Sequence, residues 1–333
     1  MEQWFNAEQV GENLFKTKEE QTITAPKQTC DLTNLCQFTE GKKMKQKYFY
    51  RTAVLSLAVL VSAIFGTSSY NANAAPINHS IHVNGTSLLK VNDYDVLYCT
   101  PIGPYVNEEK RLMVPLRSVA ELLGAKVDYN GKLQEANIRW RSSEIVFQKG
   151  AKTYKLNGTP AQMDTQPEVI QDAFVIPLGV LLRSMNLPFE YMNNKVILKD
   201  PAFDQSKIFQ RVIELDRGRS IVDNPSALNI QNFKLVEEKN SASETRGSIT
   251  VSGLNRIGST IREGKEDLHI IGFFNQTVEM DADFASVDIP DRKRPKVNKE
   301  GRVSQSLSYL KVNDPLQYIL AAGRTLQTKN ERK

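Results

Sequence analysis

Histidine and cysteine are the side chains most used to bind copper or zinc, and this chain has few of either. It contains 3 histidines and 3 cysteines among its 333 residues. His79 and His82 lie close together in the sequence, but His269 is far along the chain. A zinc or copper site needs several imidazoles or thiolates gathered around one ion. We therefore expect no metal site and no other cofactor.

Common catalytic motifs are also missing from the sequence. It has no G-x-S-x-G nucleophile elbow, no P-loop and no G-x-G-x-x-G fingerprint. Two carboxylate pairs, Glu108-Glu109 and Asp281/Asp283, have the side chains that glycosidases use. The first pair lies in a loop-like stretch and the second alternates along a strand face, so neither predicts a catalytic pair. We expect a protein that is not an enzyme. The alternative is an extracellular enzyme that acts on a wall polymer through its C-terminal region.

A basic run near residue 300 could bind an anion. Lysines and arginines neutralise phosphates, so the run predicts contact with an anionic wall polymer such as a teichoic acid. A solvated loop is the simpler interpretation. Nucleic acid is not expected, because no aromatic side chains alternate with the basic ones. The run comprises Arg292, Lys293, Arg294, Lys296, Lys299 and Arg302.

An apolar segment near the N-terminus predicts export. Ala53–Phe65 is apolar, follows a cluster of basic residues and precedes the small-x-small sequence Ala72-Asn73-Ala74. These parts make up a secretory signal peptide, here residues 44–74, with Ala72 and Ala74 at the cleavage site. The apolar run is short for a transmembrane helix, although a retained membrane anchor is the alternative. We expect a secreted or cell-surface protein.

Residues 1–43 are polar and lack sustained periodicity. We interpret them as a non-structural extension of a protein whose natural start is Met44. After signal cleavage, Cys99 is the one cysteine that remains in the sequence, so no internal disulfide can form. A small buried apolar side chain is the expected role of Cys99, and a disulfide to a second chain is the alternative.

The most regular stretch of the chain is Leu112–Trp140. Its apolar start runs into Pro115, which suits the first turn of a helix and not a strand interior. Apolar residues then recur at i, i+3, i+4 and i+7, the spacing of one helix face. Gly124 predicts the left-handed residue that ends the helix, and Asn130-Gly131 predicts a tight turn with positive φ angles. The apolar helix positions are Leu116, Val119, Ala120 and Leu123.

The same order of residues recurs after Phe174. Pro177 takes the place of Pro115, Asn186 takes that of Gly124, and Asn193-Asn194 makes the turn. A second pair of similar sequences, IHVNGT at Ile81–Thr86 and YKLNGT at Tyr154–Thr159, indicates the same relation. We predict an internal duplication whose two helices share one core, with the extra residues of the first copy in a loop at Asn92–Tyr105. The second set of apolar helix positions is Leu178, Leu181, Leu182 and Met185.

The sequence VPLRSVAELLGAKVDY, which begins at Val114, resembles the core motif of the copper amine oxidase N-terminal-like domain, also called the stalk domain. The resemblance covers roughly Ile81–Asp200. It implies a non-catalytic accessory domain of the kind found in secreted and surface proteins of Gram-positive bacteria. The second copy departs from the motif at Gly179, which replaces the arginine matching Arg117. On the exposed side of the first helix, Arg117 and Glu121 are candidate docking residues.

The predicted fold class is α+β. Short strands with frequent turns and two proline-led helices indicate helices packed on an internally duplicated antiparallel sheet over residues 75–200. The 40% apolar content is enough for a hydrophobic core. Residues 201–327 predict a smaller region that is mainly β or α+β, and 328–333 a charged tail. In this region we expect a helix at Lys207–Leu215 and another after Asn313-Asp314-Pro315, with Leu316, Ile319, Leu320 and Gly323 as its inner face.

These expectations describe a secreted, non-catalytic protein of the cell surface or wall that uses a stalk-type interaction or spacer domain. The expected partner is a cell-wall polymer or another envelope protein. A membrane-tethered envelope factor is an alternative.

Overall fold

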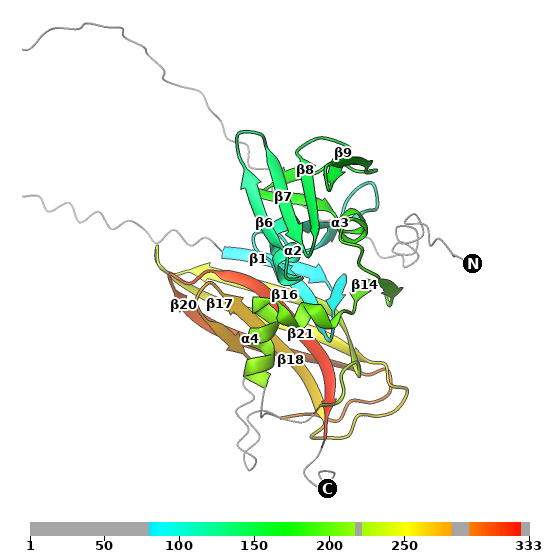
Figure 1. Ribbon diagram of the computed structural model, residues 1–333. Helices are drawn as coiled ribbons and strands as arrows, with labels where there is room; N and C mark the ends of the chain where they lie inside the picture. The colour runs from blue at the N-terminus through cyan, green and yellow to red at the C-terminus, as the bar shows by residue number, and fades with distance from the viewer. Residues whose placement is uncertain (1–79, 217–221, 282–292, 328–333) are drawn as a thin grey trace, which may run out of the picture. The chain divides into compact units, whose positions relative to one another are not determined.

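The computed structural model describes residues 80–216, 222–281 and 293–327 (Figure 1). The extension 1–43, the signal segment 44–74 with Ala72 and Ala74, and the tail 328–333 lie outside the described residues, and their assignments stay predictions. His79 and Arg292 also lie outside. Within the part of the chain that the structure describes, no helix has both the length and the apolar character needed to cross a membrane.

Strands make up most of the described chain and form four sheets, with three short α-helices beside them (Figure 1). The strand order is β1-β16-β17-β20 in sheet A and β13-β14-β2-β3-β21-β18-β19 in sheet B. It is β11-β12-β5-β4 in sheet C and β10-β9-β8-β7-β6 in sheet D. Neighbours are antiparallel except β14 and β2. The predicted α+β class agrees with this architecture.

The bounds of sheets A and B are β1 (Ser80–Thr86), β16 (Leu228–Lys239), β17 (Glu244–Asn255) and β20 (Arg302–Val312); then β13 (Glu190–Met192), β14 (Lys195–Leu198), β2 (Leu89–Val91), β3 (Tyr94–Cys99), β21 (Leu316–Leu326), β18 (Glu266–Phe274) and β19 (Val278–Met280), with β15 (Val222–Asn224) paired to β21. Those of sheets C and D are β11 (Glu168–Ile170), β12 (Ala173–Pro177), β5 (Leu112–Pro115) and β4 (Tyr105–Val106); then β10 (Thr159–Gln162), β9 (Thr153–Leu156), β8 (Ser143–Gln148), β7 (Glu135–Trp140) and β6 (Lys126–Asn130). The helices are α2 (Leu116–Leu122), α3 (Leu178–Ser184), the short 3-10 turn η1 (Pro201–Gln205) and α4 (Lys207–Asp216).

Both proline-led helices form as predicted. Pro115 and Pro177 each end a strand and begin a helix in extended backbone, because proline has no N–H for a sheet but has the φ angle of a first helical turn. All the apolar positions predicted for the two helices lie in one hydrophobic core. Gly124 and Asn186 adopt φ values of 91° and 51° after them. The helix predicted after Lys207 is also present, as α4.

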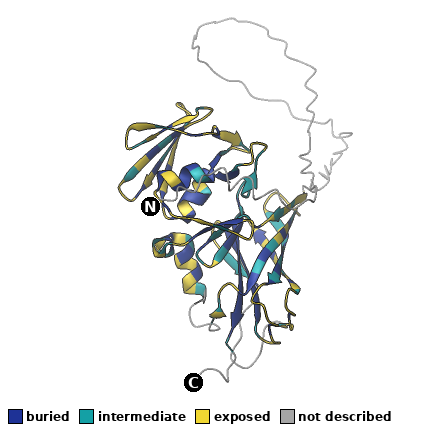
Figure 2. Ribbon diagram, turned by 90° about the vertical axis from the view of Figure 1, so that its right-hand side faces the viewer, coloured by how far each residue is buried: buried dark blue, intermediate teal, exposed yellow. Residues whose placement is uncertain are grey.

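Strands β18 and β21 in the middle of sheet B are buried on both faces. On β21, Tyr318 and Leu320 belong to the core that contains α2 and α3. Ile319 and Ala321, which alternate with them, belong to a second core against sheet A. Figure 2 shows strands that are dark blue along their length beside helices with yellow outer faces. One sheet therefore joins two hydrophobic cores.

The prediction of a helix after Asn313-Asp314-Pro315 was wrong, because Leu316–Leu326 is strand β21. A strand that is buried on both faces is apolar at nearly every position, so it matches a helical spacing as well as an alternating one. Gly323, expected on the inner face of a helix, instead lies where β21 passes close to the backbone of β16.

The prediction of a loop at Asn92–Tyr105 was also wrong. That stretch contains β3, a central strand of sheet B that pairs with β2 and β21. At Asn130-Gly131 the positive φ angles are absent, and the left-handed residue of this longer turn is Gln134 (φ 52°). The tight turn at Asn193-Asn194 has the predicted positive φ angles, 55° and 62°.

The two matching sequences take different structures. The segment Ile81–Thr86 lies within strand β1, where a side chain on Gly85 would overlap the Phe233 ring. The segment Tyr154–Thr159 instead contains a hairpin turn, with φ of 51° at Asn157 and 80° at Gly158.

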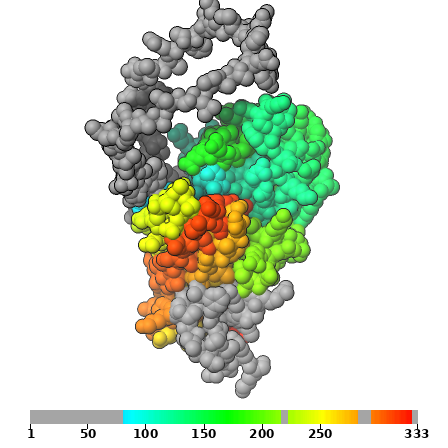
Figure 3. Space-filling model, turned by 90° about the vertical axis from the view of Figure 1, so that its left-hand side faces the viewer, coloured from blue at the N-terminus to red at the C-terminus, as the bar shows by residue number. Residues whose placement is uncertain are grey.

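The predicted domain boundary near residue 200 falls inside a continuous sheet. Strands β14, β2 and β3 precede it, and β21 and β18 follow it, yet all belong to sheet B. Strand β1 likewise pairs with β16 over its full length. In the space-filling view, green residues from before the boundary meet orange and red residues from after it (Figure 3).

Replacing Gly323 with alanine is expected to lower the free energy of unfolding by roughly 1–3 kcal/mol or more. The urea midpoint of unfolding should fall accordingly. A methyl group on Gly323 would overlap the carbonyl oxygen of Leu228, and backbone cannot move aside cheaply. Gly179→Ala is the matched control, because Gly179 is in a helix and its added carbon would meet only Arg183 Nη1, at 3.5 Å. That change should be neutral or stabilising. Equal midpoints for the two variants would contradict the close approach of β21 to β16.

Cys99 is expected to be inert to thiol reagents in the native protein. The side chain is fully buried on β3, and burial raises the pKa of the thiol to about 12, so almost no thiolate is present near neutral pH. A protein that begins at Ala75 should react with a colorimetric disulfide reagent only after denaturation. A disulfide-linked dimer on a non-reducing gel would support the alternative role of Cys99.

Candidate functional site

A groove with a volume of about 340 Å³ is lined by three parts of the structure. The first is the start of α2, the second is the inner face of sheet D, and the third is the hairpin of β11 and β12. Thr100 and Pro101, which follow β3, also line it. The other residues that matter to its chemistry are Leu116, Arg117, Val127, Tyr129, Ala136, Val169, Asp172 and Phe174.

Two aromatic rings from different sheets meet in this groove. The ring centroids of Tyr129 on β6 and Phe174 on β12 lie 6.0 Å apart, with the ring planes inclined at 55°. Tyr129 is 45% exposed and Val169 is 38% exposed, whereas Val127 is 7% exposed. Alternate residues of a strand face the same side, so β6 places Val127 in the core and Tyr129 at its margin. The groove is thus an apolar surface at the edge of the core.

Arg117 and Asp172 supply the charges of the groove. Arg117 Nη1 lies 3.5 Å from Glu121 Oε1, and these side chains are 55% and 44% exposed. An exposed ion pair of this kind contributes little, so Arg117 can exchange Glu121 for another carboxylate at small cost. The serine and threonine hydroxyl groups of the groove already donate within the fold, since Ser118 Oγ donates to Thr100 O at 3.1 Å and Thr100 Oγ1 donates to Leu316 O.

Two strands that line the groove are terminal strands of their sheets. β6 ends sheet D and β11 ends sheet C, so each has one edge without a strand neighbour among the described residues. The turn between β11 and β12 holds Gln171 and Asp172 at φ of 49° and 63°. Positive φ at both central residues suits a two-residue hairpin turn, although glycine or asparagine is usual there. This turn places Asp172 and Phe174 at the groove.

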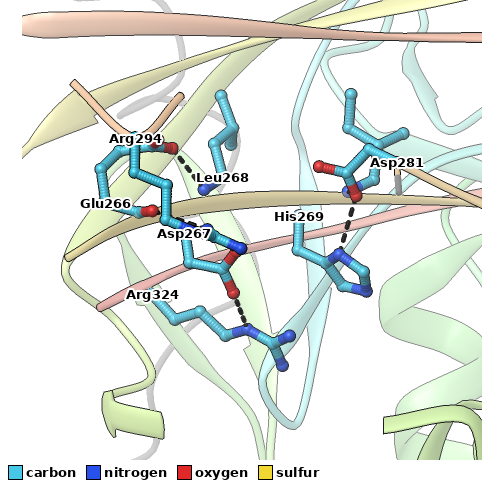
Figure 4. Close-up of polar contacts among 8 residues, drawn as sticks. Glu266, Asp267, Leu268, His269, Asp281, Arg294 and Arg324 are labelled. Atoms are coloured by element: carbon cyan, nitrogen blue, oxygen red, sulfur yellow. Dashed lines mark hydrogen bonds and ion pairs between the residues drawn. The ribbon is translucent and has the colours of Figure 1, made fainter. Parts of the chain in front are cut away.

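A buried ion cluster in sheet B contributes no side chain to the groove (Figure 4). Asp267 accepts from Arg294 Nη1 and Arg324 Nε, each at 2.5 Å, and all three side chains are 8% exposed or less. Burial would raise the pKa of Asp267, but the charges of Arg324, His269 and Arg294 outweigh burial and hold the pKa well below its usual range. An ionised carboxylate held by two arginines is a structural ion pair and a poor general base.

His269 is also buried with a carboxylate. Its Nδ1 lies 2.7 Å from Asp281 Oδ1, and the same oxygen accepts from the backbone N–H of Ile270 at 2.8 Å. Both side chains are 2% exposed or less, so a substrate in solution cannot reach the pair. Across the described residues, no group of three or more histidine, cysteine, aspartate or glutamate side chains could hold a metal ion.

A third buried cluster joins residues from distant parts of the sequence. Lys195 Nζ donates to Asp95 Oδ1, to Ser87 Oγ at 3.1 Å and to the carbonyl of Ile230 at 2.9 Å. Burial lowers the pKa of Lys195, and Asp95 opposes that shift. Ser87 donates its own proton to Asp95 Oδ1 at 2.5 Å and is 2% exposed. The Ser–Lys pair therefore holds β14 and β16 together and has no access to a substrate.

The basic run is divided by the structure. Arg294 must be removed from the predicted polyanion surface, because its side chain is 7% exposed and paired with Asp267. Lys293, Lys296, Lys299 and Arg302 are exposed, and their contact with a polyanion stays a prediction. Of the predicted docking residues, Arg117 lines the groove and Glu121 is its neighbour on α2.

Sequence reasoning missed most of the groove. The sequence pattern did not predict that Tyr129 and the hairpin that supplies Val169, Asp172 and Phe174 lie beside α2. The available signal was the separation of two short apolar runs by two residues, Gln171 and Asp172, which is the length of a tight hairpin loop.

The chain is similar to one curated protein over about half of its length. A protein from Brevibacillus choshinensis named "Protease inhibitor" is 21% identical over 159 residues, which cover 47% of this chain and 45% of that protein. The chain thus spans less than half of that curated relative. No solved structure matches the chain.

A family comparison covers the segment that contains the groove and both proline-led helices. The matched residues are 90–198. They lie within the stretch Ile81–Asp200, for which the sequence around Pro115 and Gly124 indicated a family resemblance. Residues 90–198 match the family described as the copper amine oxidase N-terminal domain.

Proposed function

We propose that this chain is a secreted, non-catalytic protein of the cell surface or wall, in which residues 90–198 form an interaction domain. The groove beside Arg117 carries the proposal. It joins exposed aromatic and aliphatic side chains to one exposed guanidinium, and apolar surface of this kind on a soluble domain marks a binding site.

The chemistry of the groove supports a binding role over a catalytic one. Asp172 is the one carboxylate among the residues that line it, so a pair of acidic groups of the kind that cleaves glycosides is missing there. Asp267 and Asp95, which pair with buried basic side chains, are themselves buried within the fold.

We also propose that the two proline-led units arose by internal duplication. In each unit a strand ends at a proline, a helix of 7 residues follows, and a left-handed residue comes soon after it. Strands β5 and β12 of the two units pair directly, with Val114 opposite Ile176. Because Ile81–Thr86 and Tyr154–Thr159 take different structures, the duplication rests on the helical units.

Export is the second part of the proposal. The signal segment 44–74, with cleavage after Ala74, supports a secreted or surface location, and a retained anchor would give a membrane-tethered envelope factor. The partner is another envelope protein or a wall polymer. Lys293, Lys296, Lys299 and Arg302 are the residues proposed to meet an anionic polymer.

Cell fractionation with N-terminal sequencing tests the location, and pull-down on purified envelope material tests the binding. We expect a mature protein that begins at Ala75 and is retained by the envelope. Retention through the basic residues should fall steeply as salt rises and in a Lys293→Gln, Lys296→Gln, Lys299→Gln variant. Retention through the groove should fall in Arg117→Gln. An unprocessed protein in the cytoplasm, or no retention by any envelope fraction, would contradict the proposal.

The relative from Brevibacillus favours a second candidate function. Because that protein is named "Protease inhibitor", this chain could bind and block a secreted protease. Incubation with representative serine, cysteine and metalloproteases, with residual activity as the readout, would identify such an inhibitor. Full activity of all three classes at a large excess of this chain would exclude the second candidate for those enzymes.

A further inference from the structure

We infer that the groove binds an extended peptide segment of another protein, with an apolar side chain packed against the Tyr129 and Phe174 pair and a nearby carboxylate on Arg117. The inference rests on the proposed function of residues 90–198 as an interaction domain, and it names the class of partner.

The strand edges favour a peptide in extended conformation. β6 supplies Val127 and Tyr129 to the groove and β11 supplies Val169. Both are terminal strands in their sheets. A terminal strand presents backbone N–H and C=O groups that a peptide strand can pair with, while alternate side chains of the peptide enter neighbouring pockets. Because two terminal strands line the groove, a peptide in extended conformation could combine main-chain pairing with side-chain contacts there.

The side chains of the groove favour one apolar anchor. Tyr129 and Phe174 contact each other with their ring planes inclined at 55°, so together they present an angled apolar surface against which one bulky side chain can pack. Val127 and Ala136, which line the same groove, are buried. An aromatic or branched aliphatic side chain placed here removes apolar surface of both partners from water, which is the main source of affinity in small pockets.

Of the two charged residues that line the groove, Arg117 and Asp172, the arginine favours a carboxylate on the part of the peptide that lies beside it. Arg117 is 55% exposed, and its contact with Glu121 is long at 3.5 Å. A guanidinium binds a carboxylate through two parallel hydrogen bonds, which Glu121 does not achieve at this distance. An aspartate, a glutamate or a C-terminal carboxylate beside the apolar anchor would make those bonds.

A synthetic peptide array probed with the purified protein tests the inference. Immobilised octapeptides would vary the central residue and place aspartate, asparagine or lysine beside it. We expect enrichment of an aromatic or branched aliphatic residue next to aspartate. For the strongest peptide in solution, Arg117→Gln and Tyr129→Ala should each weaken binding about tenfold or more. Replacing the peptide's aspartate by asparagine should cause a similar loss, and no additional loss when combined with Arg117→Gln.

Arg139→Gln is the matched control. Arg139 is an exposed arginine of the same sheet D, paired with Asp128 at 2.5 Å, and it does not line the groove. The control variant should bind the peptide as the wild type does. Peptides that bind Arg117→Gln and Tyr129→Ala as well as the wild type would overturn the inference.

A carbohydrate probe separates the inference from the broader proposal. If no peptide binds above background, or if an oligomer of N-acetylglucosamine binds and Tyr129→Ala abolishes that binding, the peptide inference fails while an interaction domain remains. If the wild type also shows no retention by envelope material, the proposed function fails with it. Retention that needs Arg117, together with peptide binding that needs the same residue, supports both.

Discussion

Replacing Asp267 with alanine is expected to lower the free energy of unfolding by about 3–5 kcal/mol. The substitution leaves Arg294 and Arg324 buried without the carboxylate that both contact at 2.5 Å. Domains are typically stable by about 5–15 kcal/mol, so the variant should be much closer to unfolding than the wild type. Urea denaturation followed by circular dichroism measures the difference.

The surface pair of Asp128 and Arg139 is the control for this prediction. It has the same separation, 2.5 Å, but its side chains are 68% and 60% exposed. Asp128→Ala should change stability by less than about 1 kcal/mol, since solvent already screens that pair. Similar losses of unfolding free energy in Asp267→Ala and Asp128→Ala would show that burial does not make the Asp267 ion pairs more stabilising than an exposed pair.

The same cluster predicts how stability depends on pH. The pKa of Asp267 is lowered in the folded protein, so its contribution is fully present above its unfolded pKa of about 3.9. That contribution is lost as the pH falls below this value toward the folded pKa. The unfolding free energy of the wild type should therefore decline on acidification below about pH 4, and Asp267→Asn should show a shallower decline over that range. Parallel pH profiles for the two proteins would contradict the assignment.

A fragment that ends at Asp216 is expected not to fold. It retains α2, α3 and sheets C and D, but loses β21, the strand that pairs with β3 in the middle of sheet B. It also loses Ile271, Phe273, Tyr318 and Leu320, which belong to the same hydrophobic core as the two helices. The fragment should show no cooperative urea transition and little near-ultraviolet circular dichroism.

A chain from Ala75 to Gln327 is the matched control, since it keeps every described strand and should unfold cooperatively. A dispersed amide spectrum and a sharp transition for the shorter fragment would show that the segment matched by the family, residues 90–198, folds without β21.

The local features of this chain were predictable from sequence. Pro115 and Pro177 interrupt strand hydrogen bonding and start helices, and the apolar spacing after each indicated the face that enters the core. These features depend on backbone sterics and on burial of one face, which neighbouring residues determine. The motif around Pro115 was therefore enough to indicate the family that residues 90–198 match.

The tertiary structure alone decided which strands share a sheet and what lines the groove. The sequence predicts a helix at β21 because packing between two cores makes nearly every position from Tyr318 to Gly323 apolar, and periodicity then no longer distinguishes a strand from a helix. Arg294 belongs to a basic run in the sequence but pairs with a buried aspartate in the fold. Tyr129 and Phe174 meet because the β11–β12 hairpin lies beside sheet D. Contacts between distant segments depend on which surfaces exclude water together, and a local pattern of residue types does not specify the partner.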